Sequence, residues 1–203
     1  MNGWAVVSFL VKGGPVMVPL LLCSLTALAV TIERLLCWRS LGDRWNAEQV
    51  LGLVGQGELA EAEALASASP HPLGRVLAAG LRHRNPSPGA AMQAAALAEL
   101  PRLRRYLPVL DTIVTMAPLL GLLGTVTGMI GAFGIMAESG INQPHAVTGG
   151  VGEALIATAT GLLIAIATLL PYNYFTARAD REAEAMEQYA TRLEVLLQAT
   201  AEA

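Results

Sequence analysis

The sequence predicts an all-helical integral membrane protein with three membrane-spanning helices, at residues 14–36, 107–136 and 151–175. Its mean hydropathy is +0.50, with 54% hydrophobic and 14% charged residues, which is more apolar than an ordinary soluble domain. Each of the three runs is long enough to cross a hydrocarbon core of about 30 Å, which takes about 20 helical residues. No basic run is interleaved with aromatic residues, so we expect no binding to nucleic acid.

The first predicted span, residues 14–36, follows a short lead over residues 1–13. A secretory signal peptide is the alternative, because Lys12 precedes the apolar run and Ala27-Leu28-Ala29 is similar to a cleavage site. The run is long for a signal peptide, and it ends at Glu33-Arg34 and Trp38-Arg39, residues typical of an anchor at the membrane surface. We therefore interpret it as a membrane helix.

The segment between the first two spans, residues 37–106, is polar, and its apolar residues repeat with a helical period. Prolines interrupt it at Pro70-His71-Pro72 and again at 85–89, so two or three soluble helices folded together are expected. Its last part, 90–105, leads into the second span in a way consistent with one long, kinked helix. A link over residues 137–150 precedes the third span, and the tail over residues 176–203 is expected to continue that span as an amphipathic helix.

The basic residues predict the orientation, because short cytoplasmic flanks carry an excess of Arg and Lys. The lead has only Lys12, and the link over residues 137–150 has no basic residue. We therefore expect the N-terminus and the link outside, and the 37–106 segment and the tail in the cytoplasm. The basic residues of the two cytoplasmic segments are Arg39, Arg44, Arg75, Arg82, Arg84, Arg102, Arg104, Arg105, Arg178, Arg181 and Arg192.

The second span carries glycines that are three or four residues apart. Small residues at this spacing let a neighbouring backbone come close, so they predict a helix-packing face. Thr125 lies on this span too. Its hydroxyl either faces a lumen or partner helix, or it donates to a carbonyl of its own helix four residues earlier. The residues assigned to the packing face are Pro118, Gly121, Gly124, Gly128 and Gly131, with Gly134 at the same spacing.

The third span has a second face of small residues, and Thr158 lies on it. At about 1.5 Å per residue, Thr125 and Thr158 fall within about a turn of each other, on the outer side of the midplane. Their matching depth favours a shared site that relays a proton or ligates a cation. A hydroxyl cannot hold a charge at physiological pH, and neither span has a carboxylate at this depth. A partner helix with a lone Asp or Glu is therefore predicted.

Asp111 lies near the inner end of the second span. At 100° per residue, Asp111, Pro118 and Thr125 fall within about 40° of one line along the helix. Asp111 would then extend a proton path from Thr125 to the cytoplasm. The alternative is that Asp111 is an interfacial residue paired with Arg104 or Arg105.

Glu153 lies near the outer end of the third span. It is about 140° around the helix from Thr158, so it need not share the same wall. As a proton-path residue it would stand at the outer mouth. Alternatively, Glu153 begins its helix as an acid that the helix dipole favours.

No other active site is indicated. The three histidines, His71, His83 and His145, lack metal-ligand spacing, and we expect them to be solvated loop residues. Cys23 and Cys37 fall about 20 Å apart on one helix, so they cannot pair within the chain. We expect no enzyme activity, no metal and no cofactor.

The small-residue motifs of the second and third spans, together with Tyr172-Asn173, resemble the ExbB/TolQ/MotA proton-channel family, and specifically its ExbB/TolQ branch. The first span, which begins at Gly13-Gly14-Pro15, is similar to that branch too. Three spans with the N-terminus outside fit it better than the four-span MotA type. The motifs are Ala117-Pro118-Leu119-Leu120-Gly121-Leu122-Leu123-Gly124-Thr125-Val126 and Glu153-Ala154-Leu155-Ile156-Ala157-Thr158-Ala159.

The resemblance implies that Thr125 and Thr158 line a central pore, with Glu153 near its outer end. It also implies a homopentamer around a dimer of an ExbD- or TolR-like protein, whose single membrane helix carries an essential Asp. The implied function is conversion of proton-motive force into mechanical work in a bacterial inner membrane, with protons as the coupling ion. That work would drive TonB-dependent transport, or a Tol-type envelope process through a TolA-like protein. Asp111 has no counterpart in the shared motif.

Two alternatives belong to other classes. A non-conducting scaffold would use the small-residue faces only to assemble and stabilise a partner. A small solute transporter would be expected to have repeated halves with interrupted helices, and the sequence has no internal repeat.

Overall fold

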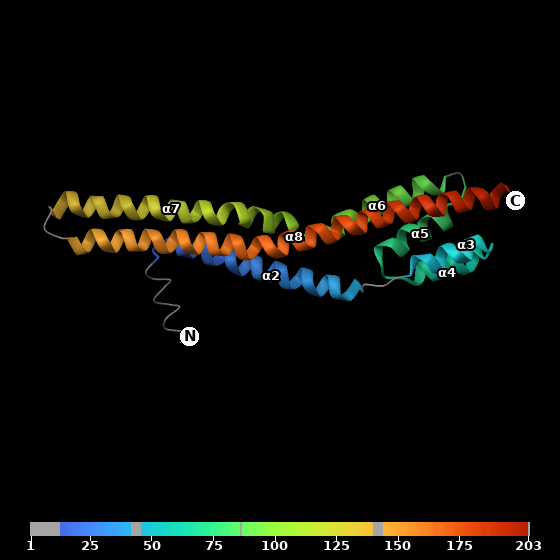
Figure 1. Ribbon diagram of the computed structural model, residues 1–203, viewed down its shortest axis with the longest axis horizontal. Coiled ribbons are helices and arrows are strands. Elements are labelled where there is room, and N and C mark those ends of the chain that lie inside the picture. Colours follow the sequence, from blue (N-terminus) through green and yellow to red (C-terminus); the bar gives the residue numbers. More distant parts are fainter. Residues whose placement is uncertain (1–12, 42–45, 86, 140–143, 203) are drawn as a thin grey trace. The chain divides into compact units, whose positions relative to one another are not determined.

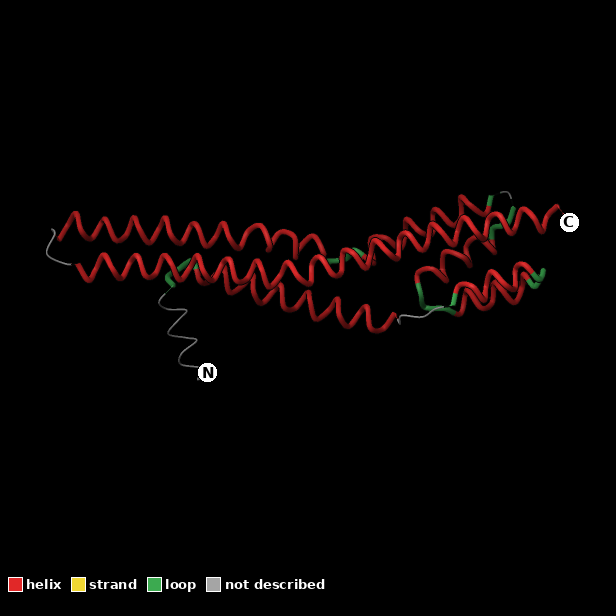
Figure 2. Tube along the Cα trace, in the orientation of Figure 1, coloured by secondary structure: helices red, strands yellow, loops and turns green. Residues whose placement is uncertain are grey.

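The computed structural model describes residues 13–41, 46–85, 87–139 and 144–202, and this part of the chain contains helices and no strand (Figure 1, Figure 2). Two compact units form, each from segments that are distant in the sequence. The membrane unit comprises Met1–Ile32 and Tyr106–Asn173, and the polar unit comprises Glu33–Arg105 and Tyr174–Ala203. The helices are α2 (Met17–Leu41), α3 (Ala47–Gly55), α4 (Leu59–Ala68), α5 (Pro72–Arg82), α6 (Pro88–Leu103), α7 (Leu107–Ser139) and α8 (Pro144–Glu202).

Three helices of the described chain are long and apolar enough to cross a membrane, over Met17–Leu41, Leu107–Ala137 and Thr148–Thr200. The predicted all-helical fold with three long apolar helices is therefore confirmed. Their large side chains are widely exposed, as Ile130, Leu163 and Leu170 illustrate. Exposed apolar surface on this scale is what a lipid-facing helix presents. The orientation and the homopentamer remain predictions.

The expected continuity between 90–105 and the second span is wrong. Helix α6 ends at Leu103, α7 begins at Leu107, and Tyr106 between them has a φ of 64°. This left-handed conformation is costly for a residue with a side chain, and it stops a right-handed helix. Pro108 then falls in the first turn of α7, where its missing N–H is tolerated.

Helix α8 is continuous over 59 residues, with Pro171 inside it. The tail therefore continues the third span as a helix, as the sequence predicts. In the polar unit, its buried residues recur every four or seven positions, which is the stripe of an amphipathic helix. These residues are Phe175, Ala179, Met186, Leu193 and Leu197.

The polar unit is a stack of short helices, in which α3 packs on α4, α4 on α5 and α5 on α6. Helix α5 lies at its centre, because Val76, Leu77 and Leu81 are fully buried. Two helices begin at a side-chain cap followed directly by a proline, which needs no partner for its nitrogen at that position. The caps are His71 for α5 and Ser87 for α6.

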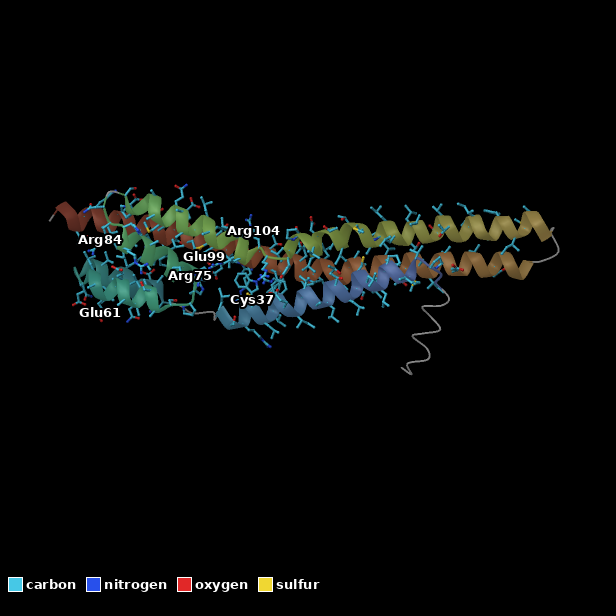
Figure 3. The ribbon with its side chains drawn as sticks, turned by 180° about the vertical axis from the view of Figure 1, so that it is seen from behind. Cys37, Glu61, Arg75, Arg84, Glu99 and Arg104 are labelled. Atoms are coloured by element: carbon cyan, nitrogen blue, oxygen red, sulfur yellow. The ribbon has the colours of Figure 1, made fainter. Side chains whose placement is uncertain are left out.

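A buried carboxylate ties α5 to α6 within the polar unit. Glu99 is only 5% exposed, and its two oxygens accept from the Arg75 guanidinium at 2.9 and 2.6 Å (Figure 3). Arg102 donates to the same carboxylate at 3.0 Å. This forked arrangement satisfies a charge that burial would otherwise penalise.

His71 is not the solvated loop residue that the sequence suggested. It is 7% exposed, its Nδ1 accepts from the Leu73 N–H at 3.4 Å, and its Nε2 lies 3.7 Å from Glu182 Oε2. Burial holds the pKa of this imidazole below its ordinary value, and the Glu182 carboxylate opposes part of that effect. His83 is exposed, whereas His145 lies inside α8 rather than in a loop.

Two residues that were expected to anchor the end of α2 at the membrane surface, Arg34 and Trp38, are buried in the protein instead. Arg34 is 2% exposed, and it donates to Glu33 at 2.5 and 2.6 Å and to the Arg102 carbonyl at 3.2 Å. Trp38 is buried, with the Arg178 guanidinium 4.9 Å from its ring centre. These contacts lie within the polar unit, to which the end of α2 belongs.

Candidate functional site

The backbones of α7 and α8 come into contact at two glycines. A Cβ placed on Gly121 would lie 3.0 Å from Thr158 Cα and 3.1 Å from the Ala157 carbonyl oxygen. A Cβ on Gly161 would overlap the Ala117 carbonyl oxygen and lie 3.1 Å from Gly121 Cα. Only residues without side chains allow so close a helix crossing. Figure 1 and Figure 3 show α7 running alongside α8 through this region.

The same contact extends toward the start of α8. A Cβ on Gly124 would lie 2.5 Å from Ala157 Cβ, and one on Gly128 would lie 3.0 Å from Ala154 Cβ. Gly131 and Gly134 differ, because a Cβ at either would meet no described atom within 4 Å. Pro118 is half-buried inside α7. The glycine stripe therefore faces α8 over part of its length and is open beyond it.

The Thr158 side chain links the two helices through a hydrogen bond. Its hydroxyl donates to the Gly121 carbonyl at 2.9 Å. The contact is possible because Gly121 has no side chain that would push Thr158 away. A hydroxyl also has two acceptor lone pairs, so Thr158 can still accept a hydrogen bond from a further donor.

The Thr125 hydroxyl donates to the carbonyl of Leu122, in its own helix, at 2.7 Å. This is the local back-bond that the sequence left open, made three residues back rather than four. Thr125 lies four residues from Gly121, which is about 6 Å or one helical turn. Since Thr158 bonds to Gly121, the two threonines lie at neighbouring levels of one helix pair.

Glu153 does not begin its helix. Helix α8 starts at Pro144 and has no acid in its first turn, and a helix dipole acts mainly within that turn. The alternative role of Glu153 as a helix-starting acid is therefore wrong. Its carboxylate instead lies against Gly14, in the turn that precedes α2. Gly14 was not among the predicted site residues, although the pair Gly13-Gly14 directly before Pro15 indicates a turn.

Asp111 lies apart from the threonines. It is exposed in the second turn of α7, and the fourteen residues to Thr125 correspond to about 21 Å of helix. Arg104, one of its two alternative partners, instead pairs with Asp180 Oδ1 at 2.8 Å. The structure thus brings Thr125 and Thr158 close to each other, and it places Asp111 at the far end of the same helix.

Comparison with known proteins gives consistent results. Residues 68–188 match the MotA/TolQ/ExbB proton channel family. The ExbB-like 1 biopolymer transport relative from Synechocystis sp. is 38% identical over 91% of this chain and 76% of its own length. The ExbB-like 3 relative from the same organism is 36% identical over 91% of both chains. The Tol-Pal system protein TolQ of Haemophilus influenzae is 41% identical over 44% of this chain and 40% of its own length.

Proposed function

This chain belongs to the MotA/TolQ/ExbB proton channel family, and we propose that it is the channel subunit of an energy-transducing complex in a bacterial inner membrane. The complex converts proton-motive force into mechanical work. Similarity to ExbB-like relatives over 91% of the chain supports a role of the ExbB kind. TonB-dependent transport is the process we propose that it energises.

One observation carries the mechanism. Thr125 and Thr158 lie at neighbouring levels of the packed α7 and α8 helices, and the sequence has no carboxylate within one turn of either threonine. A hydroxyl passes a proton on but does not store one at neutral pH. We infer that the titratable group comes from a partner, an Asp on the single membrane helix of an ExbD- or TolR-like dimer. Five copies of this chain would surround that dimer.

The energy released when one proton crosses the membrane is enough to move a partner helix between two similar packing positions. One charge crossing about 100 mV releases about 2.3 kcal/mol. The α7 surface that carries Gly131 and Gly134 has no bulky side chain at those positions. A smooth surface of this kind lowers the barrier for a partner helix to step from one position to the next.

The test is proton flux in liposomes that contain this chain and the product of a neighbouring reading frame with one membrane helix and a single Asp. Thr125→Val and Thr158→Val should abolish flux and leave the complex assembled. Thr125→Ser and Thr158→Ser are the matched controls, because they keep the hydroxyl, and they should retain flux. Full flux in both valine variants would show that the hydroxyls carry no protons.

A non-conducting scaffold remains the second candidate. The observation that favours it is that the hydroxyls of Thr125 and Thr158 both donate to backbone carbonyls, with oxygen–oxygen distances of 2.7 and 2.9 Å. A scaffold needs the volume of these side chains and not their oxygen. It therefore predicts that Val and Ser variants support the same activity of the partner, which the same assay distinguishes.

A TolQ-like role is the alternative within the family, since TolQ of Haemophilus influenzae is 41% identical over part of the chain. It would link this chain to a TolA-like protein and to envelope maintenance. Deletion of the gene separates the two roles. Loss of uptake across the outer membrane indicates the ExbB role, whereas envelope leakage with normal uptake indicates the TolQ role.

A further inference from the structure

We propose that Gly14, in the turn before α2, is a positioning residue that fixes the Glu153 carboxylate at one place beside α8. The functional meaning of this role rests on the proposed proton-channel function. The contact itself lies wholly within the membrane unit of one chain. Glu153 is half-buried there.

The end of the Glu153 side chain lies directly over the α-carbon of Gly14. A Cβ placed on Gly14 would overlap Glu153 Oε1, and it would lie 2.7 Å from the carboxyl carbon and 3.2 Å from Cγ. Three atoms of one side chain therefore occupy the space that any other residue at position 14 would fill. Glycine at this position is a steric requirement of the observed Glu153 conformation.

The backbone at Gly14 independently requires glycine. Its φ is +74°, in the left-handed region that residues with a Cβ rarely adopt. The turn closes when the Met17 N–H donates to the Gly14 carbonyl at 3.1 Å and the Val18 N–H donates to the Pro15 carbonyl at 3.2 Å. The turn therefore leads directly into α2, and its geometry is fixed by the helix that follows.

The start of α2 is held against both helices of the candidate site. A Cβ on Gly13 would lie 3.1 Å from Ile156 Cγ2 on α8, and a Cβ on Gly124 of α7 would lie 3.7 Å from Val16. Met17 is 3% exposed and Leu20 is fully buried. The segment that receives Glu153 is thus packed against both helices that carry the threonines.

A carboxylate held in this way acts as a fixed negative charge. Glu153 lies five residues from Thr158, which is about 7.5 Å along α8 and about 140° around it. It therefore lies beside the hydroxyl pair rather than within it. A fixed charge at the mouth of a low-dielectric path raises the local concentration of cations, including protons. Displacing the carboxylate would change how protons enter while leaving Thr125 and Thr158 in place.

The first experiment is a double-mutant cycle on the thermal midpoint, Tm, of the purified full chain without any partner. The four proteins are the wild type, Gly14→Ala, Glu153→Ala and the double variant. Backbone strain from Gly14→Ala is present in both backgrounds and cancels in the cycle. We expect Gly14→Ala to lower Tm strongly when Glu153 is present and much less when it is Ala. Equal Tm losses in the two backgrounds would overturn the proposed contact.

Gly14→Asn replaces Gly14→Ala in the cycle if the alanine variant does not accumulate. Asn tolerates the left-handed region better than Ala does, yet it still adds the Cβ that meets Glu153. The matched control is Gly152→Ala, next to Glu153 in sequence, because a Cβ there meets nothing within 4 Å. It should leave Tm unchanged or raise it slightly.

The second experiment measures proton flux against pH for folded complexes in liposomes. Gly14→Ala should lower flux by up to about a hundredfold, the loss that a misplacement of about 1 Å can cause, and should alter the pH profile. Gly152→Ala should match the wild type in both. An unchanged flux and pH profile in Gly14→Ala would overturn the positioning role. A wild-type complex without flux would instead refute the proposed function, and the Tm cycle would still decide whether Gly14 holds Glu153.

Discussion

The membrane unit and the polar unit hold their helices together by opposite means. In the membrane unit, α7 and α8 meet through glycine and alanine, and large apolar side chains such as Leu163 point away from the protein. In the polar unit, large apolar side chains such as Leu77 are fully buried, and the charges of Glu99 and Arg75 pair with each other.

The difference follows from the solvent around each unit. Water drives apolar side chains of the polar unit inward. Lipid gives no such drive between helices, so contact there depends on close packing and on hydrogen bonds such as that from Thr158 to Gly121. Added volume should therefore harm the membrane unit most, whereas a lost charge or cap should harm the polar unit most.

The largest effect is expected from Gly161→Ala. The new Cβ would overlap the Ala117 backbone carbonyl, which cannot rotate away, so α7 and α8 must separate. We expect a loss of about 3 kcal/mol, at the upper end of overpacking effects, measured as a lower Tm and a smaller yield of folded protein. Gly131→Ala is the control, because it adds the same methyl where nothing lies within 4 Å. A similar loss in both variants would show that glycine flexibility, not close packing, is what matters.

The next effect is expected from Glu99→Gln in the polar unit. The change removes the buried negative charge and leaves Arg75 and Arg102 facing an amide. Because Arg75 is 41% exposed, water offsets part of the penalty, and we expect a loss of about 2 kcal/mol, within the range for a broken hydrogen-bonded charge. Glu63→Gln is the control: its pair with the 60% exposed Arg82 is 3.4 Å long. Chemical denaturation of both variants measures the difference.

The third effect tests the His71 cap through pH. Burial lowers the pKa of folded His71 below its ordinary value of 6.5. Between the two pKa values, the unfolded chain therefore binds more protons than the folded chain. The free energy of unfolding should therefore fall as pH falls below about 6.5. His71→Asn replaces the capping Nδ1 of the imidazole with an amide oxygen, which can cap the helix and does not titrate. Its Tm should fall less than that of the wild type between about pH 7.5 and about pH 5.5, and an equal fall would assign the pH effect to other groups.

Sequence patterns predicted the features of the two units that depend on composition and on the spacing of apolar residues along one segment. Three apolar runs gave three long helices, and the apolar repeat after Arg178 gave the buried stripe of α8 that includes Met186 and Leu193. Both are properties of one segment by itself. Where a helix must turn is also local, yet the break at Tyr106 was missed, because a tyrosine carries no signal for a left-handed conformation.

Features that depend on several segments could not be predicted from spacing. Gly121 and Gly131 share one helical spacing, but only Gly121 lies against α8. His71 reads as a loop residue between two prolines, and it is buried because Glu182 and the α5 helix come together around it. Gly14 and Glu153 are 139 positions apart in the sequence. Tertiary contacts decide each of these features, and the spacing of residues within one segment does not predict such contacts.

The smallest effect is expected from Glu48→Gln, which tests whether burial decides how much an ion pair stabilises the polar unit. The Glu48 carboxylate accepts from Arg192 at 2.6 and 2.8 Å and from the Tyr189 hydroxyl at 3.1 Å. The Arg192 hydrogen bonds lower the pKa of Glu48, so the pair adds stability above the ordinary carboxyl pKa and loses it as pH falls through the lowered value.

Exposure should make the Glu48 pair weak and sensitive to salt. The side chains of Arg192 and Glu48 are 45% and 55% exposed, so ions screen them well, whereas the Glu99 side chain is buried and shielded. We expect the Tm difference between Glu48→Gln and the wild type to be small and to vanish between about 0.05 M and about 1 M salt. The corresponding difference for Glu99→Gln should persist. If both differences respond equally to salt, burial does not distinguish the two pairs, and the stability of the polar unit depends on charge count rather than on where its charges lie.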